Sequence, residues 1–194
     1  MYIQNPAYVL GFHGLDEIVG RKVLNAEDTL KHSTNDYDWL GHGVYFWENS
    51  PERARQWANA CSNRNSSPVK SPFVIGAIID LGICFDLLDK YWIDRLRDAY
   101  DLLVLSLEEN GHAIPENQAW GTNDMDFKKR DLDCAVIRFA IQLAELEGIK
   151  IDSVRAAFWE GFPVYPGAGF RTHNHIQLCV INTEECIKGI FIPK

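Results

Sequence analysis

Several motifs that define large enzyme classes are missing from this 194-residue sequence. There is no Gly-x-Gly-x-x-Gly after a strand-like segment, no phosphate-binding loop ending in Gly-Lys-Ser/Thr, and no Gly-x-Ser-x-Gly. These absences argue against dinucleotide-binding Rossmann folds, P-loop nucleotide hydrolases and serine hydrolases. The two closely spaced histidines, His173 and His175, have no paired cysteines or acidic cluster nearby, so we expect no metal site.

The sequence also lacks an excess of basic residues. Nineteen Lys and Arg stand against 27 Asp and Glu, which gives a formal net charge of −8. Binding of nucleic acid through general phosphate attraction requires a net basic surface, so it is not expected, although a local basic groove remains open.

Long apolar runs and paired cysteines are absent as well. Runs such as 73–79 are far shorter than the roughly 20 residues that span a bilayer, and residues 1–10 do not resemble a signal peptide. The five cysteines are odd in number and show no Cys-x-x-Cys spacing. We therefore expect a cytoplasmic protein with reduced thiols and no membrane partner. The cysteines are Cys61, Cys84, Cys134, Cys179 and Cys186.

What is present is the composition of one globular domain, with 46% hydrophobic and 24% charged residues, and we expect residues 1–194 to form it. The spacing of apolar residues alternates along the chain between the period of two typical of strands and the period of 3.6 typical of helices. It predicts strands at 8–14, 43–47, 73–81, 154–159, 176–181 and 187–192, and helices at 16–24, 51–60, 89–109 and 132–146. Residues 116–129 and 161–170 are irregular in pattern, and no internal repeat is visible. An α+β fold is expected.

Three strand segments carry residues suited to ligand binding. Phe12-His13-Gly14 places an imidazole beside a residue without a side chain, and Gly41-His42-Gly43-Val44-Tyr45 places an aromatic ring after two glycines. Gln177 offers a carboxamide on a strand that alternates in character. Taken singly, each segment has a structural explanation: a hydrogen-bonded core histidine, an aromatic core strand and a solvent-facing glutamine.

Taken together and in order, these segments resemble the His-Tyr-Glu signature of the ADP-ribosyltransferase superfamily, in its diphtheria-toxin and poly(ADP-ribose)-polymerase branch. Residues 177–193 also resemble the last two strands of that family, whereas residues 73–158 share only general character with it. The resemblance implies two packed, mostly antiparallel sheets with flanking helices around an NAD cleft.

The resemblance also implies roles for individual residues. His13 would bind the adenosine-side ribose, the Gly14 backbone would hold the nicotinamide carboxamide, and Tyr45 would stack on the nicotinamide ring. The third residue of the signature is normally Glu, whose carboxylate favours the oxocarbenium-like state as nicotinamide leaves. Here that residue is Gln177, which can orient a ribose hydroxyl but supplies no negative charge.

Gln177 leaves three interpretations open. In the first, which we favour, the protein is an NAD-dependent mono-ADP-ribosyltransferase, in the manner of a bacterial toxin or effector, that modifies an unknown macromolecular or small acceptor. Another carboxylate, Glu48 or Glu160, would then assist, and polymer elongation is not expected. In the second, the chain is a catalytically weak module that binds NAD or ADP-ribose. In the third, it is an NAD glycohydrolase, with water as acceptor.

Three further residues are candidates for the same cleft. By analogy with the family, Tyr37 and Trp39 would form a lid over the nicotinamide pocket, and Arg171 would meet the pyrophosphate or face the acceptor. Each also fits a plain surface position. The turn-rich segment 165–169 precedes Gln177 where such transferases carry an acceptor-facing turn.

Overall fold

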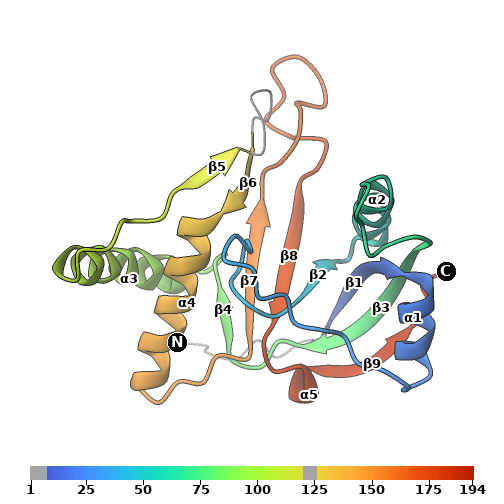
Figure 1. The fold of residues 1–194 in the computed structure, drawn as a ribbon, viewed down its shortest axis with the longest axis horizontal. Coiled ribbons are helices and arrows are strands. Elements are labelled where there is room, and N and C mark those ends of the chain that lie inside the picture. Colours follow the sequence, from blue (N-terminus) through green and yellow to red (C-terminus); the bar gives the residue numbers. More distant parts are fainter. Residues whose placement is uncertain (1–7, 120–125) are drawn as a thin grey trace.

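The computed structural model describes residues 8–119 and 126–194. Its strands are β1 (Tyr8–Asp16), β2 (Val44–Glu48), β3 (Pro72–Asp80), β4 (Cys84–Asp86), β5 (Asn117–Ala119), β6 (Phe127–Arg130), β7 (Ser153–Phe158), β8 (His175–Val180) and β9 (Ile187–Phe191). Its helices are α1 (Glu17–Leu24), α2 (Pro51–Ser62), α3 (Lys90–Glu109), α4 (Asp131–Leu146) and α5 (Thr183–Cys186). Figure 1 shows their arrangement.

Seven of these strands form one sheet in the order β4-β7-β8-β2-β1-β3-β9. Only the β4–β7 pair is parallel, and the other neighbours are antiparallel. Strands β5 and β6 form a separate two-stranded ribbon. The expected α+β class, with a mostly antiparallel sheet and flanking helices, is confirmed.

The sheet is continuous, so the expectation of two separate packed sheets is wrong in this respect. Strand β2 joins the two halves, because it pairs with β8 on one side and with β1 on the other. One core cluster nevertheless contains Leu178 of β8 together with Ala77 and Ile79 of β3. Two strands separate β8 from β3 in the sheet order, so the sheet must curve around this shared core.

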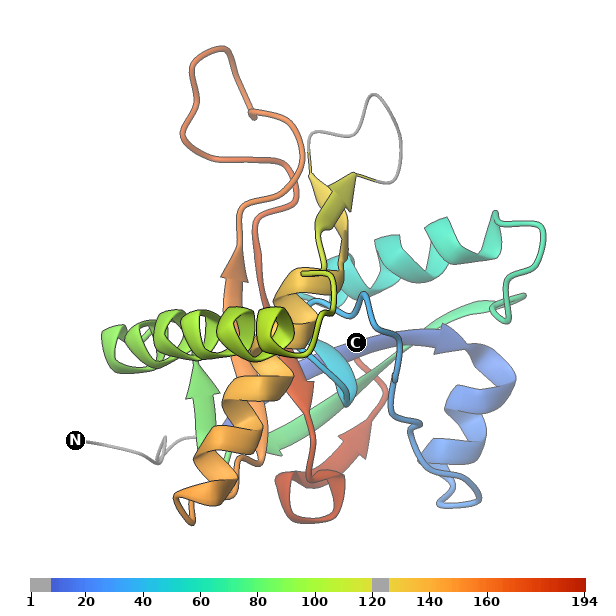
Figure 2. The same ribbon diagram turned by 60° about the vertical axis from the view of Figure 1, so that its left-hand side comes forward.

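Helices cover the two ends of the sheet differently, as the turned view in Figure 2 also shows. Helices α3 and α4 pack together over the β4–β7–β8 end through a cluster that includes Trp92, Ile137 and Val154. At the other end α2 packs on one face of β1 and β3 through Ala54, and α1 packs on the opposite face through Val23. The alternation of strand side chains accounts for these two faces.

Short elements were missed by the sequence prediction. Strand β4 has three residues, and the segment 116–129, predicted to be irregular, contains β5 and most of β6. Helix α5 lies between the predicted strands 176–181 and 187–192, where no element was predicted. Three or four residues carry too little periodicity to reveal a strand or helix, and only their distant partners define them.

Within residues 8–119 and 126–194, no helix is both long and apolar enough to cross a membrane. All five cysteines lie in this part of the chain, and each is buried with a free thiol.

Candidate functional site

Strands β1 and β2 separate at the position where His13 lies. Their pairing consists of Gly11 with Glu48 and Phe12 with Trp47. Beyond that point β1 continues along β3 as far as Asp16, and β2 continues along β8. The sheet therefore opens between its two central strands, and backbone there faces a gap in the ladder.

The His13 ring spans the beginning of this opening. Its Nδ1 lies 2.6 Å from the Tyr45 carbonyl oxygen. A carbonyl only accepts hydrogen bonds, so Nδ1 carries the proton and Nε2 remains an acceptor. Burial lowers the pKa of His13, and its hydrogen bond to Tyr45 offsets this only in part. His13 is therefore neutral at pH 7 and offers an acceptor nitrogen.

Gly14 allows a close approach between β1 and α2. A Cβ at this position would lie 2.4 Å from the carbonyl oxygen of Ala54 in α2. The glycine thus lets the helix pack directly on β1. Gly14 pairs with Val74 of β3 on one side, while its other side faces the opening.

Tyr45 joins the sheet to the connection that precedes β2. Its hydroxyl donates to the Gly41 carbonyl at 2.6 Å and accepts from the Leu40 amide at 2.8 Å. Burial raises the pKa of this hydroxyl, so it remains protonated. The hydroxyl is thus fully engaged, and the partly buried ring packs against the core cluster that contains Leu40 and Cys179.

Gln177 lies on β8 between Trp47 of β2 and Ala156 of β7. It shares a face of the sheet with Tyr45, because Tyr45 and Trp47 are two residues apart and pair with Cys179 and Gln177. Gln177 is only 8% exposed, and its Oε1 has no hydrogen-bond partner in the described part of the chain. The buried Nε1 of Trp47 also has none there.

A buried ion pair lies next to this position. Arg53 Nη2 of α2 donates to Glu160 Oε2 at 3.0 Å, and His175 Nδ1 lies 3.7 Å from the same oxygen. Burial raises the pKa of Glu160 even though Arg53 opposes this shift. The buried nitrogens Arg53 Nε and His175 Nε2 have no partner among the described residues.

His175 is a neutral acceptor in this cluster. Its Nδ1 lies 2.7 Å from the His173 carbonyl, so Nδ1 carries the proton and Nε2 is free to accept. Burial lowers the pKa of His175 to about 4. Its ring stacks on Phe158, 5.4 Å between centroids.

The two carboxylates considered from the sequence have different surroundings. Glu48 receives two hydrogen bonds from Arg155, at 2.7 and 2.9 Å, and that same guanidinium also binds Asp86 at 3.1 Å. Strand alternation places Glu48 on the opposite face of β2 from Tyr45. Glu160 is therefore the carboxylate that lies on the side of Gln177.

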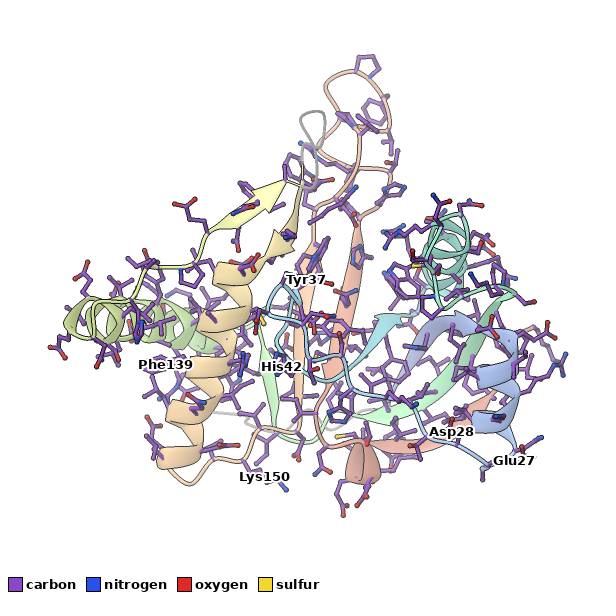
Figure 3. All side chains as sticks on the ribbon, viewed as in Figure 1. Glu27, Asp28, Tyr37, His42, Phe139 and Lys150 are labelled. Atoms are coloured by element: carbon purple, nitrogen blue, oxygen red, sulfur yellow. The ribbon has the colours of Figure 1, made fainter. Side chains whose placement is uncertain are left out.

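The two aromatic residues expected to form a lid lie on the connection between α1 and β2. Figure 3 shows Tyr37 and His42 on this connection, in front of the middle of the sheet. Trp39 donates from Nε1 to the Lys128 carbonyl, and its ring lies 6.4 Å from that of His175. Trp39 thus lies beside the candidate site, whereas the carbonyl of Tyr37 accepts from the amide of Arg130 at the end of β6.

Arg171 is engaged within its own loop. Its guanidinium lies 3.5 Å from the centroid of the Trp159 ring, and Nη1 donates to the Gly161 carbonyl at 2.8 Å. In this arrangement Arg171 holds together the base of the projecting β7–β8 loop (Figure 1).

Arg53, Trp47 and His175 were not identified from the sequence. Trp47 and His175 each lie two residues along a strand from a predicted site residue, and the period of two in a strand could have indicated them. Nothing in the local pattern around Arg53 indicates its ion pair, because its partner lies 107 residues away.

Comparison of the chain with models of known protein families, with curated proteins and with solved structures found no match.

Proposed function

We propose that the protein is an NAD-dependent mono-ADP-ribosyltransferase that releases nicotinamide and transfers ADP-ribose to an acceptor. One observation carries the proposal. His13, Tyr45 and Gln177, which are far apart in the sequence, lie on the adjacent strands β1, β2 and β8, beside the place where the sheet opens.

The unpartnered polar atoms fit the ribose part of NAD. Gln177 Oε1 is a buried acceptor, and Trp47 Nε1, on the residue paired with it, is a buried donor. A hydroxyl group accepts and donates at once, so a ribose hydroxyl could satisfy both. Leaving them unsatisfied costs about 1–3 kcal/mol each, which favours a polar ligand here.

His13 lies on the opposite face of the sheet from Tyr45, because it follows Phe12, which pairs with Trp47. An NAD molecule that passes through the opening would place a second ribose hydroxyl at His13 Nε2 and the nicotinamide against the ring of Tyr45. Gly14 contributes backbone on the side that faces the opening. NAD supplies an N-glycosidic bond, and Gln177 orients the ribose on which that bond is broken.

A second candidate function is a module that binds NAD or ADP-ribose without efficient transfer. The observation that favours it is the neutral side chain of Gln177, which cannot stabilise a positive charge on the ribose. Both functions use the same contacts, and they differ in whether the glycosidic bond breaks.

The first experiment follows nicotinamide release from labelled NAD by the purified protein, alone and with cell lysate. We expect release that depends on lysate and is lost in Gln177→Ala. The matched control is Gln142→Ala, an exposed glutamine on α4, which should behave as the wild type.

The other outcomes discriminate between functions. Equal release without lysate would indicate an NAD glycohydrolase. NAD binding without release would indicate the binding module, and absence of both binding and release would exclude an NAD-dependent function.

A further inference from the structure

Glu160 lies on an extension of the strand pair that carries Gln177. Strand β7 pairs with β8 through Phe158 and His175, and the His173 amide then donates to the Glu160 carbonyl at 3.0 Å. Side chains two residues apart along extended backbone share a face. The Glu160 side chain therefore follows Phe158 on the face of the sheet where Gln177 lies.

The Glu160 carboxylate is largely buried among side chains from other elements. Its side chain is 13% exposed, and those of Arg53 and His175 are 16% and 2% exposed. Glu160 lies two residues beyond β7, and Arg53 of α2 and His175 of β8 converge on its carboxylate. A carboxylate held by a hydrogen-bonded guanidinium has a defined orientation.

Four buried polar atoms of this ion pair and of the side chains near it have no partner in residues 8–119 and 126–194. They are Trp47 Nε1, Arg53 Nε, His175 Nε2 and Gln177 Oε1. Trp47 pairs directly with Gln177, its ring centroid lies 6.5 Å from that of His175, and Arg53 binds Glu160. Buried polar atoms in native proteins are almost always hydrogen-bonded, so two donors and two acceptors left together indicate a polar ligand.

We propose that Glu160 supplies the negative charge that Gln177 lacks. The two side chains together would then perform the two roles, orientation and charge stabilisation, that one catalytic glutamate performs in the resembled family. This inference rests on the proposed function. Gln177 orients the ribose hydroxyl, and the Glu160 carboxylate stabilises the positive charge that develops on the ribose.

Glu160 also acts as the general base that accepts the acceptor's proton. The glycosidic bond of NAD breaks with its electron pair going to nicotinamide, and a lone pair of the acceptor forms the new bond to the same ribose carbon. The proton that the acceptor then loses passes to the Glu160 carboxylate. Arg53 is a positioning residue, because it fixes the carboxylate through the hydrogen bond to Oε2.

The test compares Glu160→Gln with the wild type in nicotinamide release and in NAD binding. We expect kcat to fall about 100-fold, the usual contribution of a positioned acid or base, while the Kd for NAD changes little. Glu52→Gln, an exposed glutamate on α2 next to Arg53, is the matched control and should keep wild-type kinetics.

Two further variants separate catalysis from a structural role. Glu160→Gln combined with Arg53→Gln removes the ion pair as a neutral unit, so that no buried charge is left alone. We expect this double variant to remain as slow as Glu160→Gln. Adding Gln177→Glu to Glu160→Gln returns a carboxylate to the same face. We expect kcat of this variant to be at least tenfold higher than that of Glu160→Gln alone.

Wild-type rates in both Glu160→Gln and the double variant would overturn the inference while leaving the proposed function intact. The same holds if the double variant recovers the activity that the single variant loses, since Glu160 would then act only as the partner of Arg53. A wild-type protein that neither binds NAD nor releases nicotinamide would instead overturn the proposed function itself.

Discussion

Two histidines of the candidate site are kept neutral by burial. The pKa of His175 is lowered to about 4 and that of His13 is also lowered, and each ring donates from Nδ1 to a backbone carbonyl. In the neutral form each offers Nε2 as an acceptor, which suits hydroxyl groups better than phosphates.

The pKa of His175 makes stability depend on pH. An unfolded histidine titrates near 6.5, so between about pH 6.5 and pH 4 the unfolded chain binds more protons than the folded one. We expect the free energy of unfolding to fall as the pH falls through this range. Urea denaturation of wild type and His175→Gln at pH 7 and pH 5 measures it.

The variant should lose less stability between these two pH values than the wild type, and His13 should account for part of what remains. His112→Gln, an exposed histidine after α3, serves as control and should follow the wild type. An identical loss in wild type and His175→Gln would show that His175 is not kept neutral.

Among the elements, the short strand β4 is linked to the rest of the sheet by a side chain of β7 as well as by its backbone pairing. Arg155 of β7 binds Asp86 of β4 and Glu48 of β2, so one guanidinium links three strands of the sheet. The carboxylates hold the pKa of Arg155 above its usual value, and the guanidinium is charged throughout the accessible pH range.

Replacing Arg155 by Ala should destabilise the protein by about 3–5 kcal/mol, because two carboxylates would lose their shared counter-charge in a partly buried place. Arg97→Ala is the control, since this exposed arginine of α3 forms ion pairs with the exposed Asp94 and Asp98. Urea unfolding midpoints provide the measurement. A loss below about 1 kcal/mol for Arg155→Ala would mean that apolar packing alone holds β4 in the sheet.

At the scale of the whole molecule, the free cysteines report on the stability of the core. They are distributed over α2, β4, α4, β8 and α5, and all are buried. Burial raises the pKa of Cys134 to about 11 and those of Cys84 and Cys186 to about 12, so few thiolates form at pH 8.

We therefore expect all five thiols to react with a thiol reagent only when the protein opens, with rates that rise together as urea is added. Mass spectrometry of partially labelled protein gives the rate at each cysteine. Ser66→Cys, which adds an exposed thiol after α2, is the control and should react at once. One native cysteine that reacts early would identify a part of the molecule that opens independently.

The sequence by itself determined the main helices and strands. Apolar residues repeat with a period of 3.6 in α3 and α4, and Asp16 and Pro51 mark the starts of α1 and α2 as expected. Such signals are local, so they can be recognised without knowing what the element packs against. The three motif segments around His13, Tyr45 and Gln177 were visible for the same reason.

Only the tertiary structure decided which residues meet. It joined the strands into one curved sheet and placed Glu48 and Glu160 on different sides of that sheet. Arg53 and Glu160 are 107 residues apart, and no periodicity along the chain encodes such a pair. Their contact follows from β7 pairing with β8 and from α2 packing on β1, which depend on the burial of the entire core.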